Sequence, residues 1–289
     1  MGAALGPRAA SAQERSLLDG VDGFPFRAPY ASSLEPRTRL APVRIHRGDR
    51  RRTVALVDLG DAFAVWIRKG SPRDGAAPAG GGRGRAAGEV RRRRGGGARG
   101  FRLAAALSGG AFTRFDLQSS NNEFIEAHFR VGLQLRARWS GWAARAELYH
   151  VSSHLGDEYM VRTGERPVST AREGIEVLVE TSPLPGLLVY GGPGTIVRTK
   201  RNFVAASVRG GAAWEPRTIR WGPFRPYAAG EAFSWAELGW DPMLAAQAGV
   251  RFGHEHFRVA LTAGAGPSRA EQFFRSRETL WGVMFTLLH

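Results

Sequence analysis

The sequence predicts an all-β protein, a closed antiparallel transmembrane β-barrel of about twelve strands, with ten or fourteen as the neighbouring possibilities. Three observations predict it. Short segments of alternating apolar and polar residues follow one another along most of the chain. No run approaches the roughly 18 consecutive apolar residues of a membrane-spanning helix. The 38 Gly and 8 Trp suit strands, turns and interfacial aromatic rings better than helices.

Residues 1–36 are expected to form a loosely attached N-terminal arm, and 37–289 the barrel. The arm contains several prolines and shows no sustained periodicity. Ala10-Ser11-Ala12 resembles the small-residue cleavage site of a secretory signal, although the apolar stretch that should precede it is nearly absent. The arm is therefore interpreted as carrying a remnant signal peptide, with an Ala-rich tail as the alternative.

The barrel is expected to consist of short alternating segments separated by turn signals. The expected strands are 37–46, 53–67, 101–114, 124–138, 141–152, 172–182, 186–198, 202–215, 223–234, 243–252, 256–264 and 279–288. From the fourth strand onward the connections tend to alternate between short and long, as in a bacterial barrel with both termini in the periplasm. Two connections fit this rule poorly. The turn at 199–201 is short for the outside, and an Arg/Gly insertion at about 70–100 falls on the periplasmic side.

The alternation of faces supports a barrel over a soluble β-sandwich of similar strand count. In the segment 141–152, Ala146, Leu148, His150 and Ser152 share one face, whereas Arg145 and Glu147 share the other. The inner faces of a sandwich should be apolar. We therefore expect the charged rows to point into a lumen and to fill it with ion pairs, which argues against a wide pore.

The formal net charge of +15 does not predict a nucleic-acid partner, because much of the excess lies in one Arg/Gly run from Gly80 to Arg102. Such a run is typical of a disordered, solvated insertion. Binding of phosphate groups from nucleic acid or lipid headgroups is the alternative for this run.

Two segments carry a family resemblance. The residues FTRFDLQSSNNEFIEAHFRVGLQL (112–135) and LYHVSSHLGDEY (148–159) resemble an uncharacterised bacterial outer-membrane family, domain of unknown function 1207. The resemblance extends from about Leu34 onward and includes the YGG at 190–192. It implies an outer-membrane barrel of unsettled role.

A second, local resemblance suggests chemistry. His150-Val151-Ser152 is similar to the His-x-Ser element of outer-membrane phospholipase A and of the lipid A deacylase, which cleave acyl esters of membrane lipids. In those families the element continues with Asn-Gly, whereas here Ser153 and His154 follow, so the backbone that would stabilise an oxyanion differs in sequence.

A serine nucleophile needs an imidazole to take its proton and a third polar group to orient the ring. Residues two apart on one strand face lie about 7 Å apart at their backbones, so the His150 and Ser152 side chains can approach each other. Glu173, at the start of the next strand, is the expected third member. Asp157 and Glu158 in the intervening loop are alternatives.

The expected function is therefore hydrolysis of acyl esters of membrane lipid or lipopolysaccharide at the rim of an outer-membrane barrel, without a cofactor. The alternative is a non-enzymatic structural, narrow-channel or binding barrel. A metal site drawn from His150, Ser153, His154, Asp157 and Glu158 is a further possibility, although no spacing among these residues is diagnostic. The sequence leaves the lipid and the oligomeric state open.

Overall fold

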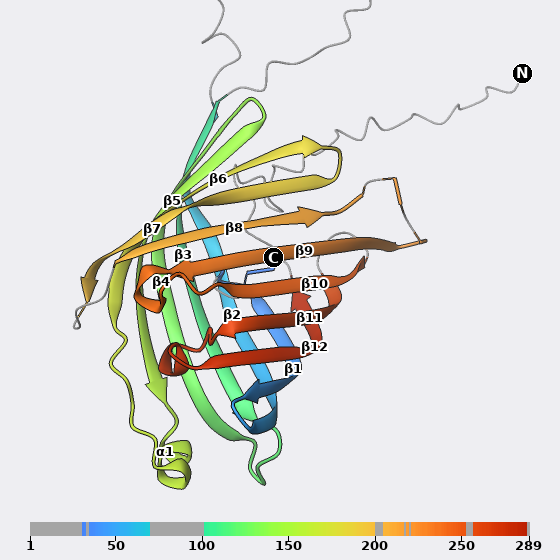
Figure 1. Ribbon diagram of the computed structural model, residues 1–289. Coiled ribbons are helices and arrows are strands. Elements are labelled where there is room, and N and C mark those ends of the chain that lie inside the picture. The colour runs from blue at the N-terminus through green and yellow to red at the C-terminus, as the bar shows by residue number, and fades with distance from the viewer. Residues whose placement is uncertain are drawn as a thin grey trace, which may run out of the picture.

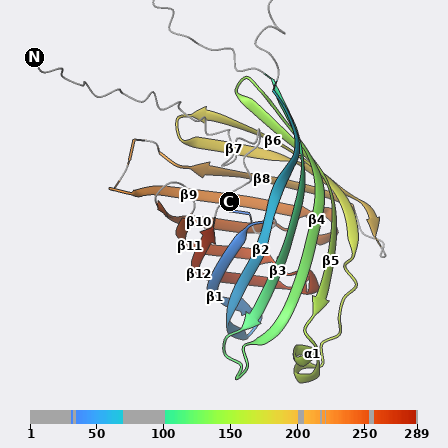
Figure 2. The same ribbon diagram turned by 180° about the vertical axis from the view of Figure 1, so that it is seen from behind.

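The computed structural model describes residues 31–32, 35–69, 101–199, 205–216, 218–219, 221–252 and 257–287. Twelve antiparallel strands form a closed barrel in which sequence neighbours pair and β1 closes on β12 (Figures 1 and 2). The strands are β1 (Thr38–Arg47), β2 (Arg50–Lys69), β3 (Arg102–Asp116), β4 (Glu123–Trp139), β5 (Trp142–Leu155), β6 (Arg172–Leu184), β7 (Leu187–Thr199), β8 (Ala206–Trp214), β9 (Phe224–Trp235), β10 (Met243–Phe252), β11 (Phe257–Pro267) and β12 (Arg277–Leu287). The expected fold class and strand number are confirmed.

Short helices occur only in connections among the residues that the structure describes. They are α1 (Asp157–Thr163), η1 (Ala236–Leu238) and η2 (Glu271–Phe273). No helix in the described ranges is long and apolar enough to cross a membrane. Strand β2 begins at Arg50 rather than at 53, because the two-residue turn at Gly48 and Asp49 is tight and Gly48 supplies the positive φ of 57° that such a turn requires.

The barrel is apolar outside and charged inside. On β5 the side chain of Leu148 is on the outer face and is 51% exposed, whereas Arg145 is on the inner face and is 0% exposed. Leu148 pairs with Leu133 on β4 and with Ile175 on β6, so an apolar row crosses three strands on the outer wall. This arrangement is the inverse of a water-soluble protein, in which apolar side chains meet in the middle.

The two ends of the barrel differ. We call the end that carries α1 the helix end and the opposite end, where β1 begins and β12 ends, the terminus end (Figure 1). Two-residue turns lie at the terminus end at 140–141 and 185–186, whereas the 156–171 and 268–276 connections lie at the helix end. This distribution follows the length pattern expected from the sequence. The 199–201 turn lies largely outside the described residues, and the 70–100 insertion lies outside them entirely.

The lumen is filled by side chains and by two inserted segments. Arg145 lies 2.9 Å from Glu176 and 3.6 Å from Glu147, so the expected ion-pair filling of the interior is confirmed. Residues Ala31, Ser32 and Glu35, which precede β1, are buried. At the helix end, the 268–276 connection contributes the buried Glu271 and neighbouring residues. The division into arm and barrel stays a prediction for the residues that the structure does not describe.

Candidate functional site

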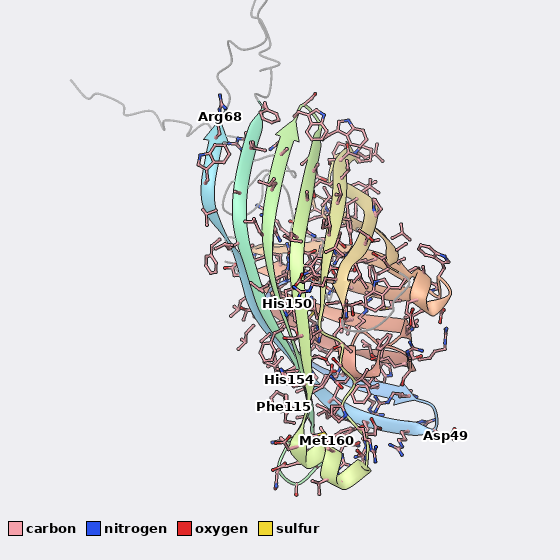
Figure 3. All side chains as sticks on the ribbon, turned by 90° about the vertical axis from the view of Figure 1, so that its left-hand side faces the viewer. Asp49, Arg68, Phe115, His150, His154 and Met160 are labelled. Carbon is pink, nitrogen blue, oxygen red and sulfur yellow. The ribbon has the colours of Figure 1, made fainter. Side chains whose placement is uncertain are left out.

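The predicted site residues lie together on the outer wall. His150 on β5 is directly opposite Glu173 on β6, and its Nδ1 atom is 3.9 Å from Glu173 Oε1. Figure 3 looks onto this wall, with His150 and His154 placed along β5 above α1. An exposed pair at this distance contributes little to stability. It does place a carboxylate behind one imidazole nitrogen and leaves the other available to a nucleophile.

Ser152 lies two residues further along β5 on the same outward face, where it is half-buried and pairs with Phe129 of β4. Within the described part of the chain, no hydrogen bond links its hydroxyl to His150. Contact between the two side chains requires rotation toward each other across the spacing of about 7 Å between their backbones. The structure therefore brings all three residues to one face but joins only His150 and Glu173.

Glu173 has a second partner that the sequence analysis missed. Arg198 Nη1 on β7 is 3.7 Å from Glu173 Oε1, and the Arg198 side chain is 79% exposed. A register shift between Glu173 and Gly174 sets Arg198 opposite Glu173. Because a bulge of this kind changes which residues face each other, counting residues along β7 does not reveal the contact.

The residues named as alternatives are arranged differently. Asp157 and Glu158 lie exposed in the first turn of α1, beyond the end of β5. Ser153 faces inward, where its hydroxyl meets Thr170 Oγ1 and accepts a hydrogen bond from Gln272 Nε2 at 2.6 Å. In the described ranges, no group of three or more His, Asp or Glu side chains is close enough to hold a metal ion. The alternative metal cluster is therefore not assembled by these residues.

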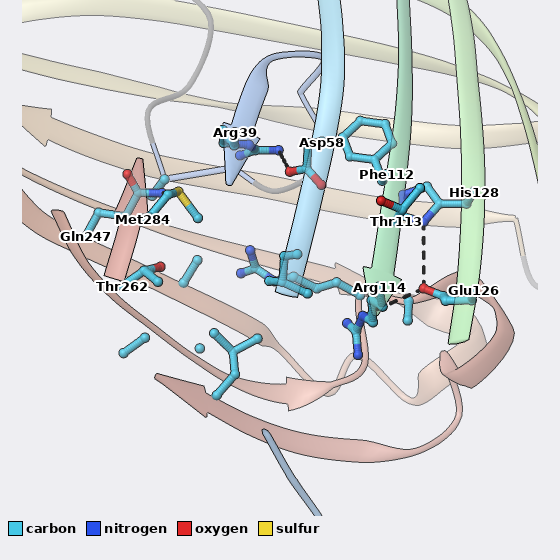
Figure 4. A pocket seen from close by; sticks show the side chains of 18 residues that line it. Arg39, Asp58, Phe112, Thr113, Arg114, Glu126, His128, Gln247, Thr262 and Met284 are labelled. Atoms are coloured by element: carbon cyan, nitrogen blue, oxygen red, sulfur yellow. Dashed lines mark hydrogen bonds and ion pairs between the residues drawn. The ribbon is translucent and has the colours of Figure 1, made fainter. Parts of the chain in front are cut away.

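The barrel interior holds a second candidate site, a cavity of about 60 Å³ (Figure 4). Arg39 and Asp58 form an ion pair of 2.7 Å on its wall, and His128 stacks on Phe112 with ring centroids 4.6 Å apart. His128 is 7% exposed, and neither of its ring nitrogens has a hydrogen-bond partner in the described structure. At roughly 10–15 Å³ for each water, the cavity has room for a few water molecules and is too small for a lipid.

At the helix end, an ion pair and hydrogen bonds hold the 268–276 connection against the barrel wall. Arg172 on β6 donates to both carboxylate oxygens of Glu271, one of them at 2.6 Å. Burial raises the pKa of Glu271, but the adjacent Arg172 more than offsets it, so the pKa lies below its usual value. Gln272 adds two hydrogen bonds to the backbone of Val168, at 2.7 and 3.0 Å. The connection 268–276 is thus held inside the barrel mouth.

Comparison with known proteins gives a family and a fold. The family model described as "Protein of unknown function (DUF1207)" matches residues 97–286, more than half of the chain. No curated protein matches the chain in sequence.

Among solved structures, outer membrane phospholipase A from Escherichia coli is 13% identical, with a TM-score of 0.54 over 90% of this chain and 91% of that chain. The outer membrane phospholipase dimer of Salmonella typhi with bound calcium is 13% identical, with a TM-score of 0.53 over 89% and 92%. LpxR from Salmonella typhimurium is 11% identical, with a TM-score of 0.41 over 87% and 100%. At these identities the similarity to the two phospholipases establishes the barrel fold and not the activity.

Proposed function

The chain belongs to the DUF1207 family of proteins of unknown function, and we propose that it is an outer-membrane barrel that hydrolyses acyl esters of membrane lipids on its outer wall. The proposal for the location rests on the inverted polarity of the barrel. Large apolar side chains such as Leu133, Leu148 and Leu261 are exposed on the outside, while charged residues such as Arg145 and Glu147 are buried inside. Hydrocarbon is the solvent in which such an outer surface is stable.

One observation carries the proposal for the activity: Ser152, His150 and the opposed Glu173 share one outward face on neighbouring strands. In the proposed reaction, the Ser152 hydroxyl attacks the ester carbonyl while His150 takes its proton, and Glu173 orients the imidazole and stabilises its charge. The alcohol leaves after protonation by His150. Water activated by the same imidazole then releases the fatty acid from the acyl-serine.

The position of the proposed site supports a membrane lipid as substrate. An acyl ester lies where the lipid headgroup meets the hydrocarbon, and the site borders an apolar wall that includes Leu148 and Val131. The charged Glu173 and Arg198 lie near the helix end of the barrel, at the start of β6 and the end of β7. A lipid aligned with the wall would therefore keep its acyl chains beside apolar residues and its ester beside Ser152.

The test is release of fatty acid from phospholipid or lipopolysaccharide by the purified barrel in detergent. Ser152→Ala should lower the rate on the order of 10³-fold or more, because loss of the nucleophile disables the whole constellation. Ser153→Ala is the matched control, because this neighbouring hydroxyl faces the lumen and should not be needed for hydrolysis on the outer wall. Equal rates for Ser152→Ala and the unmodified protein would reject the proposed nucleophile.

The filled lumen favours a second candidate, a non-enzymatic structural or binding barrel. Arg145 and Arg209 are fully buried in the interior and are each bonded to several carboxylates. Such packing opposes a wide aqueous pore. If the unmodified protein releases no fatty acid from either lipid and shows no conductance steps in planar bilayers, this second candidate replaces the hydrolase.

A further inference from the structure

The side chain of Glu35, which does not belong to any barrel strand, lies in the lumen. Glu35 precedes β1, yet its residue is only 2% exposed and its side chain reaches strands β5 and β8. Ser32, from the same part of the chain, is also fully buried. A strand residue faces the lumen because side chains alternate along the strand. Glu35 lies before the first strand, so the contacts that hold its side chain in the lumen need a separate explanation.

Two guanidinium groups hold this carboxylate. Arg145 Nη1 donates to Glu35 Oε2 at 2.6 Å, and Arg145 Nη2 donates to Oε1 at 2.7 Å. Arg209 Nη1 donates to the same Oε1 at 2.9 Å. The Arg145 contact is the parallel, bidentate geometry in which guanidinium recognises carboxylates most specifically.

The wall positions both guanidinium groups independently of Glu35. Glu176 Oε2 on β6 accepts from Arg145 and from Arg209, each at 2.9 Å, and Glu231 on β9 is 3.2 Å from Arg209 Nε. These acceptors belong to strands and stay in place whether or not Glu35 is present. Removing Glu35 would therefore leave two preorganised donor groups that face an empty position in a site with little access to water.

Backbone contacts place Glu35 in the site. Arg39 Nη2 donates to the carbonyl of Glu35 at 3.3 Å, and Arg39 Nη1 donates to the carbonyl of Ser32. Arg209 Nη2 donates to Ser32 Oγ at 2.5 Å. The described residues before β1 are thus held in the lumen by the Glu35 carboxylate and by several polar contacts of the backbone and of Ser32.

We propose that Arg145 and Arg209 form a carboxylate-binding site in the lumen, which the chain's own Glu35 occupies and which accepts small monocarboxylates when Glu35 is removed. The site does not depend on the proposed hydrolysis, because Arg145 points into the lumen whereas Ser152 points out from the same strand. Its ligand class is a planar carboxylate with no bulky substituent, since the surrounding side chains are buried.

The experiment is chemical rescue of the full-length chain folded in detergent, with thermal unfolding followed by heat-modifiable gel migration. Glu35→Ala should unfold at a lower temperature than the unmodified protein in sodium chloride. Sodium formate, and more weakly acetate, should raise that temperature in a saturable manner at constant ionic strength, because a bound ligand stabilises the folded state by mass action. The unmodified protein should not respond, since Glu35 fills the site.

Glu165→Ala is the matched control, because it removes a carboxylate that is partly exposed near α1 and lies 3.9 Å from Arg50. It should show no difference between formate and chloride. If Glu35→Ala does not fold in chloride, its refolding yield in formate becomes the measurement, and recovery of folded barrel supports the site. The same response of Glu35→Ala to formate and chloride, in stability or in yield, would overturn the proposal.

Discussion

Replacing Leu148 with arginine tests whether the outer wall lies in hydrocarbon. Leu148 is near the middle of β5, half exposed, and flanked on the outer face by Leu133 and Ile175. Full transfer of a leucine side chain from water is worth about 1.5–3 kcal/mol, so loss of the half-exposed side chain in Leu148→Ala should cost roughly 1 kcal/mol of lipid contact. Arginine in the hydrocarbon region adds a further penalty, which reaches about 2–4 kcal/mol at the bilayer midplane.

The assay is urea-dependent folding into phospholipid vesicles, with the free energy of unfolding obtained by linear extrapolation. The quantity to compare is the difference between the Arg and Ala variants at one position, because this difference removes the contribution of the original side chain. Trp142, on the outer face at the terminus end of β5, is the matched position. Near the interface the difference between Arg and Ala should fall to about 0–1 kcal/mol.

An outer wall that faces water predicts a much smaller difference between the two variants. On a water-exposed surface, a substitution at a half-exposed site usually changes stability by no more than about 0.5 kcal/mol. If the difference between Leu148→Arg and Leu148→Ala is this small, the outer wall does not face hydrocarbon. The outer-membrane location and the proposed lipid substrate would then both fail.

Two further predictions concern the interior. Because the pKa of Glu271 is lowered in the folded barrel, its pairing with Arg172 stabilises the mouth above the unfolded value of about 4.3 and is lost as the pH falls through the folded value. Protease cleavage within 268–276 should therefore rise at acidic pH in the unmodified protein, and should be high and insensitive to pH over this range in Glu271→Gln. Gly132→Ala should destabilise the barrel by about 1–3 kcal/mol, because the new Cβ would lie 2.5 Å from Glu147 Oε1 and 2.9 Å from Ser108 Oγ. Gly109→Ala, with no atom within 4 Å of the added Cβ, should cost less than 1 kcal/mol in the same urea titration, and equal losses would contradict the packing argument.

Much of the candidate site was predictable because it depends on local alternation and on adjacent strands. His150 and Glu173 share the outward face because side chains alternate along β5 and β6, which are sequence neighbours and pair with each other. The contact of Arg198 with Glu173 was not predictable in the same way, because it depends on a register shift between β6 and β7. The catalytic role of the three residues stays a prediction.

The sequence by itself determined the architecture. A strand has a side-chain period of two, so residues such as Arg145 and Leu148 reveal their opposite faces without any partner, and the order of segments and turns sets the twelve strands. Only the tertiary structure showed that residues from before β1 enter the lumen and join its ion pairs. Glu35 meets Arg145 across 110 residues of sequence, and closure of the barrel brings β1 beside β12. Contacts of this kind leave no periodic signal, because they form only when distant segments share the same enclosed space.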